Sequence, residues 1–223
     1  MVDLWPWVTL VLLGAFHGLN PAMGWLFAVG LGLQERDRGA VARALVPIAI
    51  GHAASLAATA ALVAAARGAL DERTVRLGVA GVLVAFGGYR LVRGVRHKAR
   101  AGMRVGFAGL VLWSFLASSV HGAGLMAMPA LLALGAAAPG TSGTPAPSGH
   151  AGHASAPLPA FGSAAAAAAA VGIHTVAMLA VAGVIALAVF DRFGLGVLRR
   201  AWVNLDLLWA LVLLLSGLFM LAL

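Results

Sequence analysis

Six long apolar runs follow one another along the chain, and none of them alternates polar and apolar residues as a barrel strand does. They cover residues 4–33, 45–66, 77–95, 105–135, 163–190 and 202–223. A helix that crosses a bilayer needs about 20 apolar residues. The pattern therefore predicts an all-α integral membrane protein, with six transmembrane helices in a single transmembrane domain over residues 1–223.

The composition supports this prediction and excludes several classes of function. The 223 residues are 62% hydrophobic and 10% charged, with a mean hydropathy of +0.98 and no cysteine. Such a chain has no room for a separate soluble catalytic domain, and we expect no enzyme. Thiolate metal sites and disulfides are excluded. The segment before the first run carries Asp3 and no Lys or Arg, so we expect this run to be retained rather than cleaved as a signal peptide.

The formal charge of +8 is distributed as a topology signal rather than as a nucleic-acid surface. The odd-numbered connections carry twelve of the fifteen basic residues, and the even-numbered ones carry Arg67, Arg73 and Arg76. The positive-inside rule places the odd connections in the cytoplasm and both termini outside. Abundant Ala, Gly and Arg with few Lys is typical of a GC-rich bacterial genome, so we expect the inner (plasma) membrane.

One connection differs in composition from the rest. Residues 136–162 are rich in Pro, Gly, Ser and Ala, which predicts a flexible external loop. It carries His150 and His153, a pair that can capture a soft or borderline cation. An incidental pair on an unstructured loop is the alternative.

The two halves of the chain share histidine motifs. Residues 16–18 (Phe-His-Gly) match residues 120–122 (Val-His-Gly), and residues 51–55 resemble residues 173–177. Each half has three runs, so the second half is upside down relative to the first. We therefore expect two inverted three-helix repeats, about 1–95 and 105–223. Secondary transporters often have this construction, with the substrate site near the midplane.

Four histidines fall inside the apolar runs: His17, His52, His121 and His174. Polar residues at membrane depth are costly and normally face the interior of the bundle. We expect these four to point into one cavity with a shared metal, proton or cofactor role. Simple hydrogen bonding between helices is the alternative.

A proline is expected to interrupt the first run. Pro21 lacks an amide donor and clashes with the carbonyl of His17, so the helix should kink or break there. Such a break is tolerated where it lines a cavity, and the freed carbonyls and the amide oxygen of Asn20 can join His17 as ligands. The fourth run has its own proline, Pro129, at which a similar break is expected.

Secondary candidates surround this predicted site. The thioether sulfur of Met23 or Met126 suits a soft ion such as Cu(I), although methionine is also an ordinary packing residue. The hydroxyls of Ser55 and Thr175 can donate to a substrate or to another helix. The carboxylate of Asp206 can serve proton coupling or pair with Arg199 or Arg200. The six tryptophans, Trp209 among them, are interpreted as interface anchors.

Several of these motifs resemble a known family. They are residues 17–21 (His-Gly-Leu-Asn-Pro), 51–52 (Gly-His), 87–90 (Gly-Gly-Tyr-Arg), 172–175 (Gly-Ile-His-Thr) and the His-bearing loop. Together they look like the nickel/cobalt efflux (NicO type) and UreH-like branch of the lysine-exporter superfamily. The resemblance implies a small transporter of divalent metal ions, with His17 and His52 at the positions of its motif histidines. The acidic positions of the first motif are replaced by Asn20, Pro21 and Ala22, and its second His is missing. A site without carboxylates favours softer or monovalent ions.

The sequence thus predicts a transporter of a metal cation, possessing a midplane histidine site between two inverted repeats and coupled to protons. The transition-metal ion is its substrate, and no tightly bound cofactor is expected. The alternatives are a membrane protein that binds haem between paired histidines, and a membrane metalloenzyme or an assembly factor for another metalloenzyme. The expected partners are the lipid bilayer and the ion. The oligomeric state stays open, a homo-oligomer included.

Overall fold

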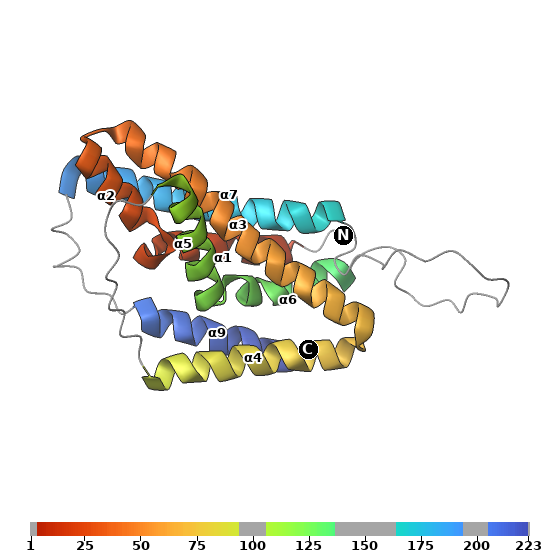
Figure 1. Ribbon diagram of the computed structural model, residues 1–223. Coiled ribbons are helices and arrows are strands. Elements are labelled where there is room, and N and C mark those ends of the chain that lie inside the picture. The colour runs from red at the N-terminus through yellow and green to blue at the C-terminus, as the bar shows by residue number, and fades with distance from the viewer. Residues whose placement is uncertain (1–3, 94–105, 137–163, 194–204, 223) are drawn as a thin grey trace.

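The computed structural model describes residues 4–93, 106–136, 164–193 and 205–222, and in these ranges the chain is helical with no strand. The elements in chain order are α1 (Trp5–Leu19), η1 (Pro21–Met23), α2 (Trp25–Glu35), α3 (Arg38–Ala69), α4 (Glu72–Arg93), α5 (Phe107–His121), α6 (Ala123–Ala136), α7 (Ala164–Ala188), η2 (Val189–Phe193) and α9 (Leu205–Ala222) (Figure 1).

Three of these helices are long and apolar enough to cross a membrane. They are α3, α4 and α7, and α5 with α6 makes a fourth if this pair, bent by 69°, counts as one span. The apolar helices α1 and α9 are shorter. The prediction of an all-helical membrane protein is confirmed at this level. Each of the six apolar runs contains a helix or a pair of helices, but their lengths do not establish six spans.

The first run breaks at the predicted proline. α1 ends at Leu19, Asn20 is extended, Pro21 begins the short 3-10 turn η1, and Gly24 has φ +119° before α2 begins. The side-chain oxygen of Asn20 accepts a hydrogen bond from the amide of Ala22 at 2.9 Å and so caps the turn. The proline supplies the break because it cannot donate to the carbonyl of His17, and Asn20 stabilises the turn that results.

The break in the fourth run lies at a glycine instead of the proline expected there. α5 ends at His121 and α6 begins at Ala123, with Gly122 between them at φ +71°. This left-handed conformation favours glycine, which has no Cβ. Pro129 lies inside α6 and is buried, so the expectation of a break there was wrong. Pro47 is likewise accommodated inside α3. The two breaks thus follow His17 and His121 at different distances.

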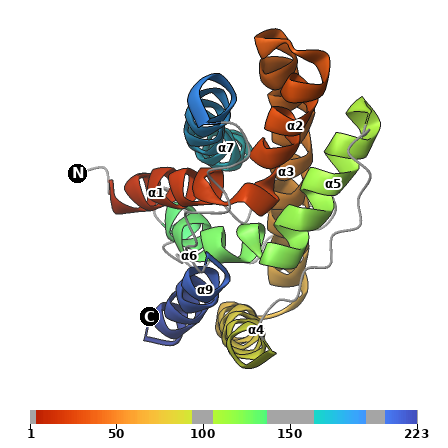
Figure 2. The ribbon, with the colours of Figure 1, turned by 90° about the vertical axis from the view of Figure 1, so that its left-hand side faces the viewer.

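The helices pack in three principal pairs: α1 with α7, α3 with α5, and α4 with α9. α4 and α9 lie side by side along one edge of the bundle in both views (Figures 1 and 2). Glycines bring the first two pairs together, because a Cβ on Gly14 would collide with the carbonyl of His174, and one on Gly51 with the carbonyl of Val111. Small residues commonly permit such close packing in membrane helices.

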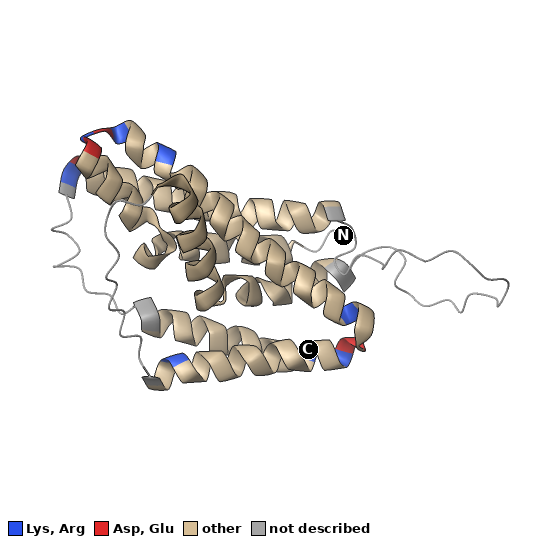
Figure 3. Ribbon diagram, viewed as in Figure 1, with Lys and Arg blue, Asp and Glu red and all other residues tan. Residues whose placement is uncertain are grey.

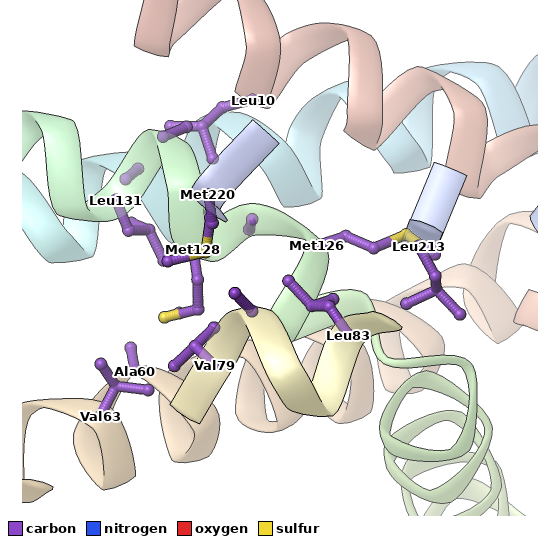
Figure 4. Packing of buried hydrophobic residues seen from close by; sticks show 14 of the residues in the cluster. Leu10, Ala60, Val63, Val79, Leu83, Met126, Met128, Leu131, Leu213 and Met220 are labelled. Carbon is purple, nitrogen blue, oxygen red and sulfur yellow. The ribbon is translucent and has the colours of Figure 1, made fainter. Parts of the chain in front are cut away.

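Buried apolar side chains form two clusters. The larger one joins α1, η1, α3, α4, α6, α7 and α9 and includes Leu10, Leu83, Met126 and Leu213 (Figure 4). The second joins α2, α3, α5 and α7 and includes Trp25, Ile48 and Met178. Buried side chains of α6 and α9 therefore pack the α4–α9 pair against the rest of the bundle.

Charged residues in the described ranges lie at the two ends of the bundle and leave its middle apolar (Figure 3). At one end, Arg43 pairs with Asp37 at 2.8 Å and with Glu35 at 3.3 Å, and Arg38 pairs with Asp191 at 3.3 Å. The amide of Gly39 and, less strongly, the guanidinium of Arg43 hold the pKa of Asp37 below its ordinary value. Charges at the ends and an apolar middle are what a membrane requires.

The predicted external loop over residues 136–162 begins at the last residue of α6. The rest of it, with His150 and His153, lies outside the described residues.

Candidate functional site

Three of the four predicted intramembrane histidines meet in the middle of the bundle. His17 of α1, His52 of α3 and His174 of α7 each have no exposed surface. Their ring centroids are 5.4 Å apart for His17 and His52, 4.9 Å for His17 and His174, and 5.4 Å for His52 and His174. His17 and His174 are 157 positions apart in sequence, and together with His52 they form one compact triangle. We call these three residues the histidine cluster.

Backbone carbonyls fix the tautomer of two members of the cluster. Nδ1 of His17 lies 2.6 Å from the carbonyl oxygen of Leu13, and Nδ1 of His174 lies 3.1 Å from that of Leu10. A carbonyl can only accept, so Nδ1 carries the hydrogen in both rings. In a neutral imidazole, Nε2 then presents its lone pair, which is the form that binds a metal ion.

The third member, His52, contacts the hydroxyl of Ser118, which in turn contacts the thioether of Met23. Nδ1 of His52 lies 2.8 Å from Oγ of Ser118, and this hydroxyl donates to the sulfur of Met23 at 3.9 Å. In the arrangement in which the serine hydroxyl donates to sulfur, its oxygen accepts from Nδ1 of His52. The Nε2 lone pair of His52 is therefore also available. Sequence reasoning missed Ser118, although its spacing of four from Ser114 places both serines on one face of α5.

The cluster concentrates unsatisfied acceptors. Nε2 of His17, of His52 and of His174 is buried and has no hydrogen-bond partner within the described residues. A buried acceptor without a partner costs about 1–3 kcal/mol. Three of them side by side create a demand for a cation or for a strong hydrogen-bond donor, and this is the main chemical feature of the site.

The fourth histidine is placed differently. His121 ends α5, is 3% exposed, and its Nδ1 donates to the carbonyl of Ala117 at 2.7 Å. Its ring meets the indole of Trp209 at a centroid distance of 5.4 Å, and the same indole meets His17 at 4.5 Å. Of the four histidines expected to share one site, the structure thus brings three together in the cluster, and Trp209 contacts both His17 and His121.

Trp209 was misread from the sequence as an interface anchor. It has no exposed surface, stacks on Phe16 at 5.0 Å, and donates from Nε1 to the carbonyl of His121 at 2.5 Å. That carbonyl belongs to the last residue of α5, at the helix break. The signal in the sequence was its depth, because Trp209 lies seven residues beyond the start of the sixth run at Trp202.

Of the secondary candidates, Met23 contacts a partner of the histidine cluster, whereas Ser55 and Met126 have other neighbours. Met23 is 1% exposed and reaches the cluster through Ser118. Ser55 is buried and pairs with Ser119 across the α3–α5 contact at 2.9 Å. Met126 packs beside Leu213 in the apolar cluster (Figure 4).

Thr175 follows a cluster histidine directly. It is 7% exposed, and its hydroxyl has no hydrogen-bond partner among the described residues. The amide oxygen of Asn20, expected as a ligand, is used to cap η1. Asp206 lies in the first turn of α9, but its side chain is outside those described.

The spacing of the cluster suits a single ion. Three imidazoles bound to one ion at about 2 Å have ring centroids about 5 Å apart, close to the observed separations. Among the described residues, however, no three His, Asp or Glu side chains are oriented so that they hold a metal ion in this conformation. Binding at the cluster therefore requires the rings to turn toward a common point.

The haem alternative fits this geometry less well. A porphyrin held by two histidines occupies the plane midway between their rings. For His52 and His174, that plane passes near His17, whose centroid is 5.4 Å from one and 4.9 Å from the other. The third imidazole thus lies where the macrocycle would be.

Comparisons with protein-family models, with curated proteins and with solved structures yield no match to this chain.

Proposed function

We propose that this chain is a membrane transporter of a metal cation, and that the cation binds at His17, His52 and His174. The observation that carries the proposal is the set of three buried Nε2 atoms that lack partners at the centre of an apolar bundle. Each is presented by a neighbour that holds Nδ1, as ligating histidines in metal sites usually are. The ion is the transported substrate, and no catalytic step is assigned to the site.

Two helix breaks beside the cluster support transport rather than static binding. α1 stops two residues after His17, and α5 stops at His121. Broken helices at membrane depth normally line a binding site, because their terminal backbone groups need partners other than lipid. Here the indole of Trp25 donates to the carbonyl of Leu19 at 3.2 Å, and that of Trp209 to the carbonyl of His121.

The two proposed inverted three-run repeats are supported by the way in which their helices pair, because equivalent helices form equivalent pairs. α1 packs on α7 as α5 packs on α3, while α4 packs on α9. Within these pairs, Gly14 lies against the backbone of His174, and Ser118, its equivalent by the repeat offset, contacts His52. His17 and His121 donate to the carbonyls four residues before them. Such repeats permit one half to rock against the other around the site.

Proton coupling follows from the same chemistry. A proton and a metal ion compete for one Nε2 lone pair, so loading of the cation displaces protons. We place the protein in the inner (plasma) membrane with both termini external, by the distribution of basic residues. The likeness to the nickel/cobalt efflux and UreH-like branch belongs to this proposal, since its motif residues His17 and His52 both belong to the cluster.

The test is uptake of radioactive or fluorescently detected metal ions into proteoliposomes that contain the purified full chain. Wild type is compared with the triple variant His17→Ala/His52→Ala/His174→Ala and with His150→Ala/His153→Ala as a matched control outside the described bundle. We expect uptake by wild type and by the control and none by the triple variant. Equal uptake by the triple variant, with its helix content and oligomer profile retained, would overturn the proposal.

A further inference from the structure

We propose that the histidine cluster selects a soft monovalent cation, Cu(I), for which Ag(I) is the stable probe, over divalent Zn, Ni or Co. This inference rests on the proposed function and names the substrate class of the same site. It is carried by the charge, the number and the softness of the ligands that the bundle places together.

The first argument is charge. The carboxylates in the described ranges, apart from Asp206, lie at the ends of the bundle, and they are Glu35, Asp37, Asp71, Glu72 and Asp191. The cluster itself offers neutral imidazoles, and the side chain hydrogen-bonded to His52, that of Ser118, is neutral. An ion transferred to a dry site keeps its full charge, and the desolvation cost rises steeply with that charge. A ligand set without carboxylates therefore penalises a divalent ion much more than a monovalent one.

The second argument is the number of ligands. The three rings form a nearly equilateral triangle with sides of 4.9–5.4 Å. Structural zinc is almost always four-coordinate, and zinc held by three histidines takes a water or a substrate as its fourth ligand. Ni(II) favours square-planar or tetragonal sites. The fourth intramembrane histidine, His121, contacts the indole of Trp209, which also contacts His17. Three neutral nitrogen donors suit a d10 monovalent ion, which accepts low coordination numbers.

The third argument is softness. The sulfur of Met23 is buried and lies 3.9 Å from Oγ of Ser118, which in turn holds His52. Thioether sulfur favours Cu(I) and is a poor ligand for hard cations. A small turn of the flexible methionine side chain, away from Ser118, brings a fourth and soft donor toward the cluster. Met23 also follows the break at Pro21, so its position is set by the same turn that ends α1.

The experiment is equilibrium binding to the full chain in detergent, in a chloride-free buffer, with Ag(I), Zn(II) and Ni(II) as separate probes. The background carries His150→Ala and His153→Ala, so that the loop contributes nothing. Bound metal is counted by elemental analysis after desalting, and affinities come from competition with chromogenic chelators. We expect about one Ag(I) per chain, bound more tightly than Zn(II) or Ni(II), and lost in the triple histidine variant.

Two further variants isolate the role of sulfur and of charge. Met23→Leu should weaken Ag(I) binding about tenfold while Zn(II) binding is unchanged, as expected for a residue that tunes a metal site. Met128→Leu is the matched control, because Met128 is a fully buried methionine of the same apolar cluster as Met23, on α6 (Figure 4), and should change neither. Asp206→Asn should leave Ag(I) binding unchanged.

The outcomes separate the two proposals. Tighter binding of Zn(II) or Ni(II) than of Ag(I), or loss of divalent binding in Asp206→Asn, would overturn the monovalent inference and leave cation transport standing. Wild type that binds none of the three probes, or a triple histidine variant that binds as wild type does, would overturn both. Equal loss of Ag(I) and Zn(II) in Met23→Leu would contradict the role of sulfur.

Discussion

The imidazole of His17 meets the indole of Trp209 edge to face, with ring centroids 4.5 Å apart and an interplanar angle of 82°. This contact joins the first apolar run to the last. The same indole also contacts His121 and hydrogen-bonds to its backbone carbonyl. One residue of α9 therefore contacts both a member of the cluster and the last residue of α5, and we infer that it keeps the cluster and the end of α5 in a fixed relationship.

Replacement of Trp209 tests that relationship. Trp209→Ala should destabilise the protein by about 3–5 kcal/mol, because it leaves a cavity where the indole was fully buried. Trp209→Phe keeps an aromatic face and loses the donor to His121, so the loss should be smaller, about 1–3 kcal/mol. Thermal unfolding in detergent measures both.

Trp5→Ala is the matched control for this prediction. Trp5 is 37% exposed and contacts Phe219 at 6.0 Å at the margin of the bundle. Its removal should cost much less stability than the removal of Trp209. Equal effects of the two alanine variants would show that Trp209 is ordinary packing.

Ser118 is predicted to matter for binding and only modestly for stability. Ser118→Ala removes the partner of Nδ1 of His52, so the ring is free to change its tautomer and its orientation. Loss of such an outer partner typically lowers metal affinity by about 10- to 100-fold. Cation binding to the purified variant measures the effect.

Ser114→Ala provides the control, one turn earlier on the same helix. Ser114 is equally buried and donates to the carbonyl of Ile48 at 2.7 Å, without contact to a histidine. Both variants should lose about 0.5–1.5 kcal/mol of stability, but only Ser118→Ala should lose affinity. Equal affinities would remove Ser118 from the site.

Most of the helical architecture was predictable from the sequence, because apolar runs of this length admit few other structures in a membrane. The break at Pro21 was predictable for a similar reason, since proline acts locally through its missing amide hydrogen. The break at Gly122 was not, because a glycine in a helix becomes a break only when its surroundings favour a left-handed conformation. Pro129, the obvious local candidate, is instead accommodated in α6.

The candidate site was predictable in composition but not in arrangement. Position inside an apolar run singled out His121 together with His17, His52 and His174, as polar residues in membrane helices generally have a structural or functional reason. The separation of His121 from them depends on how α9 packs, and periodicity contains no information about the partner of Trp209. Ser118 was missed because a single serine in a membrane helix is common in helix packing.

Close packing of α3 on α5 is predicted to depend on Gly51. A Cβ there would collide with the carbonyl of Val111 and approach the amide nitrogen of Phe115 to 2.9 Å. Backbone cannot move as a flexible side chain does, so Gly51→Ala should cost about 1–3 kcal/mol. It should also disturb His52, the next residue in the chain, and so lower cation affinity.

Gly81→Ala is the control for this substitution. Apart from its chain neighbours and the backbone of its own helix, no heavy atom of the described residues lies within 4 Å of a Cβ built on Gly81, which is exposed on α4. Alanine is the better helix former by about 1 kcal/mol, so this variant should match or exceed wild type in thermal stability. A destabilised Gly81→Ala, or a neutral Gly51→Ala, would show that the α3–α5 contact is looser than the structure describes.

The beginning of α3 should stabilise the protein in a pH-dependent way through Asp37. Its carboxylate accepts from the amide of Gly39 at 2.8 Å and pairs with Arg43, so its pKa in the folded protein lies below the ordinary value of 3.8. A lowered pKa means that the ionised form favours folding. The contribution of Asp37 to stability is therefore fully present above pH 3.8 and is lost as the pH falls through the lower pKa of the folded protein.

Asp37→Ala should reduce the unfolding temperature at neutral pH, and the difference from wild type should close on acidification. Asp37→Asn keeps a capping oxygen without the charge and should fall between them. A difference that widens below 3.8 would contradict this account.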